Sequence, residues 1–221
     1  MKELYTIGHS NHPIDKFLDL LTQQGITAIA DVRSHPYSKY NPQFTYKSLK
    51  ETLKKHDIAY VFLGNELGAR TKELTCYRDG QVQYALLAQT KAFQDGIERL
   101  KKGIESYRVA LMCAEKEPLN CHRMILITRH LRDEELIIQH ILADSSVETQ
   151  FEAERRLIET LKISQAQTTL SIEQQIELAY EEQSQKIAYR QKQAVQEDNE
   201  DYEQNSTVHD WLYEKNRADV F

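Results

Sequence analysis

The last hundred residues of this chain contain neither glycine nor proline, because all seven glycines and all four prolines occur at or before Pro118. Glycine and proline mark turns and interrupt helices, so the first half should be rich in turns and the remainder mostly helical. No run of 18 apolar residues exists either, which excludes the sequence pattern of a membrane-spanning helix. We therefore expect no membrane partner.

Cysteine is also scarce. The chain has three cysteines, and an odd number argues against a disulfide framework and fits a reducing compartment. The first residues, MKELYTIGHS, lack the basic start and long apolar core of a secretion signal, so we expect a cytoplasmic location. The GxGxxG, GxxxxGK and GxSxG patterns are absent, and no familiar nucleotide-binding or hydrolase motif identifies the reaction.

Charge is unevenly distributed along the chain. Residues 1–150 carry 20 basic and 19 acidic side chains, whereas residues 151–221 carry 8 and 15, which together give the net charge of −6. A nearly neutral body with an acidic tail argues against nonspecific binding of nucleic acid by the whole surface. A local basic cleft that takes nucleic acid stays compatible with these counts.

Apolar runs alternate with helical patterns through the first 145 residues. The runs predict five strands, at residues 4–7, 26–32, 58–63, 107–112 and 136–141. Helical spacing of apolar residues predicts helices at residues 14–21, 46–55, 82–102 and from 124 onward. This alternation is typical of an α/β domain whose mostly parallel, five-stranded sheet has helices on both faces.

Residues 146–221 differ in character, and we divide the chain into an α/β domain, 1–145, and a helical, acidic C-terminal extension, 146–221. A helix around Leu157 could still pack on the domain, and Ser171 is a candidate cap for another. The extension is either a solvated helical tail or an arm for homodimerisation or a partner, with Trp211 as a candidate anchor.

Polar side chains follow three of the predicted strands, in Gly8-His9-Ser10, in Asp31-Val32-Arg33 and in the segment from Cys113 to Arg123. Ligands of parallel sheets bind beyond the carboxyl ends of the strands. We therefore expect these turns to meet at one edge of the sheet and to form one polar site.

The segment CAEKEPLNCHR, residues 113–123, contains the highest concentration of candidate catalytic and binding side chains. A helix beginning near Cys121 would direct free backbone N–H groups at an anion and would lower the pKa of a thiol, and Arg123 would add a bidentate partner. Cys113 or Cys121 is then a candidate nucleophile. Alternatively, Cys113 only packs and Glu115 only pairs with a lysine.

A metal site is a further alternative for the same segment. The eight-residue step from Cys113 to Cys121 is not the spacing of a CxxC zinc motif, so we assign no metal ligand and name no cofactor.

The other candidates each have a plainer explanation. His9 moves protons or contacts phosphate, or else it is a hydrogen-bonded imidazole while Ser10 caps a helix. Arg33 binds an anion, or it pairs with Asp31 or Glu115. His140, on an apolar strand, is either a ligand-binding residue or a satisfied core histidine.

An aromatic loop follows Arg33. Tyr37, Tyr40 and Phe44 either stack on a base or hold this loop in place.

Five motifs in this order resemble the domain of unknown function 488 family: TIGHS at 6–10, DVRSHPYS at 31–38 followed by NPQF, LGNELG at 63–68, LMCAEKEPLNCHR at 111–123 and IIQHI at 137–141. The resemblance covers roughly residues 4–142. It implies an α/β three-layer fold and a set of polar residues at the strand ends. In this chain these correspond to His9, Ser10, Asp31, Arg33, Cys113, Glu115, Cys121, His122, Arg123 and His140.

Two functions fit this pattern. In the first, an enzyme acts on a phosphate-bearing substrate, a nucleotide or a nucleic-acid end: Arg33 and Arg123 hold the anion, and His9 or His122 moves protons. In this case Glu115 or Asp31 orients the histidine, and a cysteine is the nucleophile. In the second, the same pocket binds a small anionic ligand without turnover.

Overall fold

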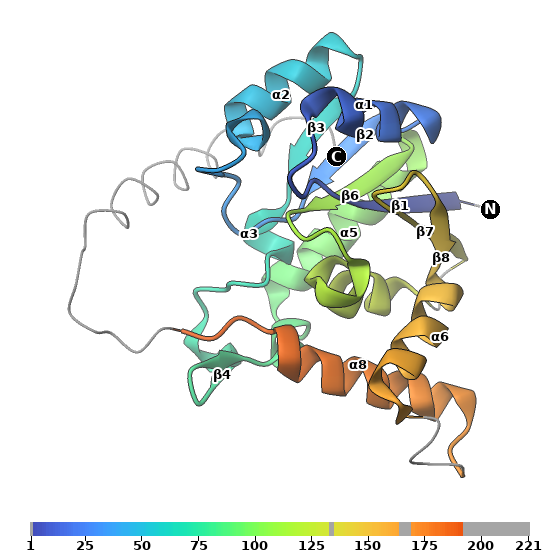
Figure 1. The fold of residues 1–221 in the computed structure, drawn as a ribbon. Coiled ribbons are helices and arrows are strands. Elements are labelled where there is room, and N and C mark those ends of the chain that lie inside the picture. Colours follow the sequence, from blue (N-terminus) through green and yellow to red (C-terminus); the bar gives the residue numbers. More distant parts are fainter. Residues whose placement is uncertain (1, 133–134, 164–168, 192–221) are drawn as a thin grey trace.

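A six-stranded sheet organises the computed structural model, which describes residues 2–132, 135–163 and 169–191 (Figure 1). The strand order is β3-β2-β6-β1-β7-β8. Five strands are parallel, and β8 pairs antiparallel with β7 at one edge. The strands are β1 (Lys2–Gly8), β2 (Ala28–Asp31), β3 (Ala59–Phe62), β6 (Val109–Cys113), β7 (Leu136–Ile141) and β8 (Val147–Thr149).

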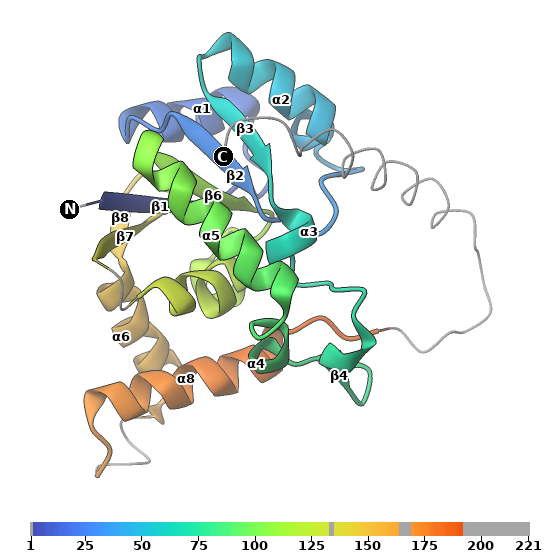
Figure 2. The same cartoon turned by 180° about the vertical axis from the view of Figure 1, so that it is seen from behind.

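Helices cover both faces of the sheet, which confirms the predicted α/β architecture. Figure 2 shows α5 lying across one face, with α1 and α2 behind the sheet. The longer helices are α1 (Ile14–Gln23), α2 (Tyr46–Lys55), α5 (Lys91–Ser106), α6 (Gln150–Leu161) and α8 (Ile172–Ile187). Two single-turn helices, α3 (Gly64–Leu67) and α4 (Tyr84–Leu87), lie in the loops.

Side chains of each strand alternate between the two faces, as the period of two requires. In β1, Tyr5 and Ile7 join the core beneath α1 and α2, whereas Leu4 joins the core beneath α5. Both faces are buried, which explains why the parallel strands appear as nearly continuous apolar runs in the sequence.

The predicted helix at residues 82–102 is not continuous. The chain forms a small hairpin, β4 (Tyr77–Arg78) and β5 (Gln81–Val82), then α4, and only at Lys91 begins α5. Thr90 caps α5 by accepting a hydrogen bond from the backbone N–H of Phe93, so a new helix begins there. The fifth predicted strand, 136–141, agrees with β7, but the antiparallel strand β8 was not predicted.

The helix expected from residue 124 is also irregular. Residues Arg123–Ile127 form a π-helical turn, and Thr128–Leu131 continue as a 3₁₀ turn. π-Helical turns are rare and occur frequently at functional sites.

The described part of the extension packs onto the α/β domain. Leu157 of α6 and Ile176, Ala179 and Tyr180 of α8 belong to the same core cluster as β6 and α5. Ser171 caps α8 as predicted, and its side chain accepts from the backbone N–H of Gln174. The apolar stripe of α8 is therefore buried within its own chain. Trp211 lies outside the described residues.

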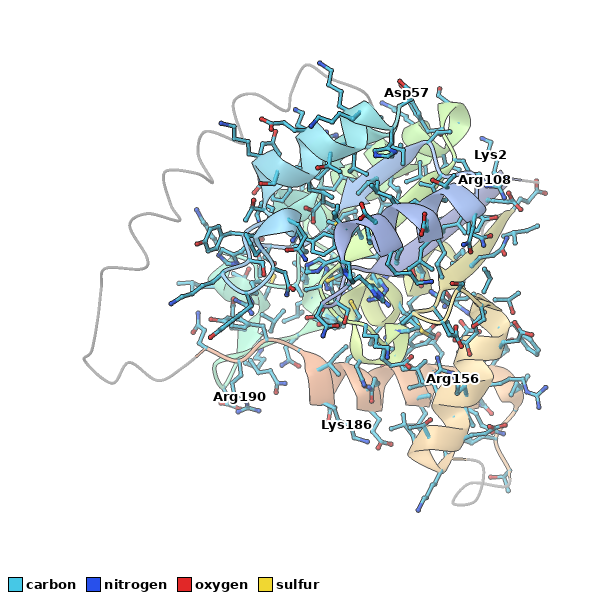
Figure 3. The ribbon with its side chains drawn as sticks, turned by 45° about the horizontal axis from the view of Figure 1, so that its top comes forward. Lys2, Asp57, Arg108, Arg156, Lys186 and Arg190 are labelled. Atoms are coloured by element: carbon cyan, nitrogen blue, oxygen red, sulfur yellow. The ribbon has the colours of Figure 1, made fainter. Side chains whose placement is uncertain are left out.

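Charged side chains lie around the outside of the molecule, as Asp57, Arg156 and Lys186 illustrate (Figure 3). No helix in the described ranges is both long and apolar enough to cross a membrane.

Candidate functional site

The end of β1 lies directly against the loop that follows β6. A Cβ on Gly8 would lie 1.9 Å from the carbonyl oxygen of Glu115, so only glycine fits at this position. Beyond the strands, the backbone N–H of His9 donates to the carbonyl of Cys113, and that of Ser10 donates to Ala114, both at 2.9 Å. The chain thus brings the first and third predicted polar turns into contact.

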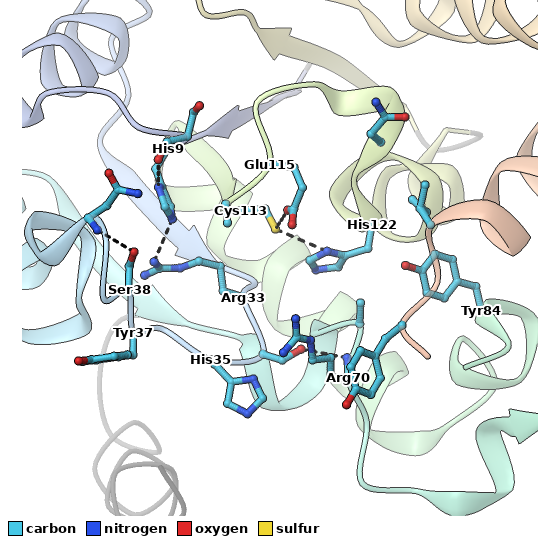
Figure 4. A pocket seen from close by; sticks show the side chains of 18 residues that line it. His9, Arg33, His35, Tyr37, Ser38, Arg70, Tyr84, Cys113, Glu115 and His122 are labelled. Carbon is cyan, nitrogen blue, oxygen red and sulfur yellow. Dashed lines mark hydrogen bonds between the residues drawn. The ribbon is translucent and has the colours of Figure 1, made fainter. Parts of the chain in front are cut away.

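A cavity of about 500 Å³ lies at this edge of the sheet (Figure 4). Its wall contains six of the predicted site residues and many residues from the loops after β2 and β3. The lining residues are His9, Ser10, Arg33, Ser34, His35, Tyr37, Ser38, Asn41, Ala69, Arg70, Tyr84, Cys113, Ala114, Glu115, Asn120, His122, Ile187 and Tyr189. This volume is in the range of small-molecule and cofactor pockets.

Arg33 lies on this wall but its charge is already balanced. Its Nε donates to Asp31 Oδ1 at 2.9 Å and its Nη2 to Asp31 Oδ2 at 2.6 Å. The hydroxyl of Tyr60 also donates to Asp31 Oδ2. Asp31 is fully buried and is not among the residues that line the cavity, so it orients Arg33 rather than contacting a ligand. The ion pair considered as the plainer explanation of Arg33 therefore exists.

His9 is held as a neutral imidazole. Its Nδ1 lies 2.8 Å from the carbonyl oxygen of Ser10, which only accepts, so Nδ1 carries the proton and Nε2 accepts from Nη1 of Arg33. Burial, followed by the charge of Arg33, lowers the pKa of His9 to about 4. The ring stacks on Phe44 with centroids 4.4 Å apart, so Phe44 packs beneath the site and is buried.

A compact group of sulfur, nitrogen and oxygen atoms occupies one side of the cavity. The thiol of Cys113 donates to Glu115 Oε2 at 2.8 Å, and the thiol of Cys121 lies 3.4 Å from the same oxygen. His122 Nδ1 lies 3.6 Å from Cys113 Sγ and 3.9 Å from Cys121 Sγ. We call Cys113, Glu115, Cys121 and His122 the four-residue cluster.

The fold fixes the tautomer of His122. Its Nε2 lies 3.0 Å from the carbonyl oxygen of Val32, at the end of β2, and must donate to it. In the neutral ring, Nδ1 is then an unprotonated acceptor directed at the two sulfurs. Glu115 is the exposed member of the cluster, and the other three are buried.

The two thiols differ in acidity. Burial, together with the neighbouring Cys121 and Glu115, raises the pKa of Cys113. Burial opposes ionisation of Cys121 as well, but the hydrogen bond with Cys113 and the charge of Arg123 bring the pKa of Cys121 below its ordinary value. Cys121 is therefore the sulfur that carries negative charge most readily.

Arg123 does not line the cavity, which corrects the prediction that it holds an anion there. Its fully buried guanidinium donates to the backbone carbonyls of Glu115, at 2.6 Å, and Lys116, at 3.0 Å, and to the hydroxyl of Thr6. These contacts fix the loop that carries Glu115. Arg123 is thus a positioning residue for the site.

His140 also lies apart from the cavity. Its Nδ1 is 2.8 Å from Thr6 Oγ1 and its Nε2 is 3.0 Å from Gln150 Oε1, and the side chain is fully buried. Burial and the charge of Arg123 lower its pKa to about 3. This is the satisfied core histidine considered as the alternative, and not a ligand-binding residue.

Several lining residues were not predicted individually. Arg70 comes from the long loop after α3, and its guanidinium lies over the ring of Tyr189, which follows α8. The length of its polar loop was the signal for Arg70, whereas nothing near Tyr189 indicated a site. Tyr37, named among the loop aromatics, does line the cavity. Tyr40 is exposed and does not line the cavity.

One of three comparisons with known proteins gave a match. The family model described as "Domain of unknown function DUF488" matches residues 13–130, more than half of the chain. Neither the curated proteins nor the solved structures gave a match. The matched region contains β2, β6, the cavity loops that follow β2, β3 and β6, and the four-residue cluster. The chain therefore belongs to the domain of unknown function 488 family.

Proposed function

We propose that the protein is an enzyme that acts on a phosphate-bearing substrate of nucleotide size, either a free nucleotide or a nucleic-acid end. The observation that carries this proposal is the composition of the cavity wall. It contains two arginines, three histidines, three serines and two asparagines, but one carboxylate, Glu115. A wall rich in hydrogen-bond donors favours an anionic ligand.

Arg70 is the side chain best suited to the phosphate. It is exposed at the cavity and makes no ion pair within the described part of the chain, in contrast to Arg33. Its stacking on Tyr189 holds the guanidinium in place and leaves its edge available to donate. Ser34 and Ser38, on the loop that contains Arg33, add hydroxyls to the cavity wall.

The reacting centre would be the four-residue cluster. Cys113, Glu115 and His122 reach the cavity, and His9 lines the opposite side. His122 Nδ1 is a ready proton acceptor because Nε2 is committed to Val32. Proton-transfer groups that share a cavity with the side chains expected to bind the anion support an enzyme over a simple anion receptor.

Binding is tested first. AMP, dAMP, ribose 5-phosphate and inorganic phosphate are each titrated into the protein while its melting temperature is recorded. A ligand at 100 times its Kd stabilises the fold by about 2.7 kcal/mol. We expect Arg70→Gln to weaken binding at least tenfold. Arg78→Gln, a matched change on an exposed arginine outside the cavity, should leave binding unchanged.

Turnover is tested separately by chromatography of each stabilising ligand after incubation with the protein. We expect a product with the native protein and none with His122→Gln. Stabilisation without any product would overturn the enzyme and leave the non-catalytic anion-binding module. An absence of stabilisation by every phosphate compound would overturn the substrate class.

A further inference from the structure

The four-residue cluster contains two cysteine thiols beside its histidine and glutamate, and proton transfer alone does not require these thiols. Two thiols, one imidazole and one carboxylate come from the end of β6, the loop after it and the start of the π-helical turn. One donor atom from each side chain lies within 4.8 Å of all the others. Soft thiolates together with an imidazole are the donor set that zinc prefers.

The distances match those of a tetrahedral site. Zinc bonds of about 2.3 Å to sulfur and about 2.0–2.1 Å to nitrogen or oxygen imply donor–donor separations of about 3.3–3.8 Å. The imidazole nitrogen lies 3.6 and 3.9 Å from the two sulfurs, and Cys121 Sγ lies 3.4 Å from Glu115 Oε2. The Cys113–Glu115 distance, 2.8 Å, is shorter, and it is the length of the thiol hydrogen bond that an ion would replace.

Groups outside the cluster hold these donors in position. The carbonyl of Val32 accepts from His122 Nε2, the arrangement that orients a metal-binding histidine in known sites. Arg123 holds the backbone at Glu115, and the absence of a side chain at Gly8 lets this loop lie against β1. Hence the fold positions the donors through contacts that do not involve an ion.

We propose that Cys113, Cys121 and His122 bind a zinc ion through Sγ, Sγ and Nδ1, and that Glu115 occupies the fourth position. The three first-named residues are buried, whereas Glu115 is exposed and faces the cavity. A fourth position directed at a cavity is typical of catalytic zinc, because water or a substrate oxygen replaces the weakest ligand there. The cysteines would then be ligands and not nucleophiles. Nδ1 of His122 would bind the ion and not accept a proton, so proton transfer would fall to His9 on the cavity wall.

The fold brings the two cysteines together although their spacing does not match a short zinc motif. The eight-residue step between the cysteines argued against a metal, since short zinc motifs place two ligands within one turn. The intervening loop instead returns the chain to the end of β6, with the 3₁₀ turn Pro118–Asn120 reversing its direction. The proposal is independent of the phosphate-bearing substrate, because it concerns binding of the metal alone.

The test measures metal in the full chain purified under reducing conditions. We expect about one equivalent of zinc per chain by elemental analysis. After removal by a chelator, Co²⁺ should bind and give the absorption bands of thiolate coordinated to tetrahedral cobalt. Cys76→Ser, a buried cysteine outside the cluster, is the control and should retain both the zinc and the cobalt spectrum.

Variants of the ligands complete the test. Cys121→Ser and His122→Gln should lose most of the metal, and circular dichroism establishes that each is folded. Glu115→Gln changes an exposed side chain, so it should fold, keep the thiolate bands and bind zinc at least tenfold more weakly. Chelator-treated native protein that takes up neither Zn²⁺ nor Co²⁺, or a Glu115→Gln protein with unchanged zinc affinity, would overturn the proposal.

Discussion

The guanidinium of Arg33 donates from Nη1 to Nε2 of His9 over 3.2 Å. This bond forms because the other ring nitrogen of His9 donates to the carbonyl of Ser10. The histidine is therefore neutral, and the arginine charge is balanced by Asp31 on its other side. His9 and Arg33, with Asp31 buried behind them, therefore form a preorganised, nearly neutral part of the cavity wall.

The buried ion pair behind this wall should be sensitive to loss of one partner. Asp31→Asn leaves the 5 % exposed guanidinium of Arg33 without a counter-charge, which costs about 3–5 kcal/mol of unfolding free energy. Glu105→Gln breaks the exposed pair with Lys2 and should cost less than about 1 kcal/mol. Urea denaturation of both variants measures the two values, and equal losses would contradict this account.

A side chain at Gly8 should disrupt the site. Gly8→Ala places a Cβ 1.9 Å from the carbonyl of Glu115, so either β1 or the loop must shift. We expect destabilisation well above the roughly 1–2 kcal/mol expected for Gly80→Ala. An alanine at position 80 would be strained only by the positive φ, because a Cβ there meets nothing within 4 Å. A Gly8→Ala protein as stable as Gly80→Ala would show that the loop moves freely.

His140 should contribute to loss of stability in acid. Its pKa in the fold is about 3, below its usual 6.5, so the unfolded chain binds a proton first as the pH falls. The full contribution is present above pH 6.5 and is lost between about 6.5 and 3, at up to about 1.4 kcal/mol per pH unit. His140→Gln should reduce the slope of unfolding free energy against pH in this window. An unchanged slope would be inconsistent with a neutral His140.

Substitution of Arg123 should lower the stability of the fold, whereas substitution of Arg70 should weaken ligand binding with little effect on stability. Arg123→Lys cannot reproduce the contacts with both backbone carbonyls and Thr6, and should cost about 3 kcal/mol in unfolding free energy. Arg70→Gln, on an exposed side chain, should change stability by less than about 1 kcal/mol. Thermal melts without ligand compare the two, and the reverse order would refute the positioning role of Arg123.

The parallel strands were predictable because both of their faces are buried, and continuous apolar runs such as that of β2 follow from this burial. The helix α2 agrees residue for residue with the predicted range, 46–55. The break before α5 was missed because the apolar spacing from Leu86 to Phe93 continues across it. The antiparallel strand β8 has three residues, too few to show a period.

By itself the sequence determined the alternation of strands and helices and the turns that carry polar side chains. Burial of an element produces runs or periodic spacing of apolar residues, and chain reversal requires turn residues, so both can be recognised in the local sequence. The tertiary structure decided which of these side chains share a cavity. Arg123 and His140 lie in the interior and not at the cavity. Arg70 and Tyr189, which are far apart along the chain, are in contact at the cavity wall. The tertiary structure also brought Cys113 and Cys121 to one imidazole, since distances between separated segments depend on strand order and not on spacing in the sequence.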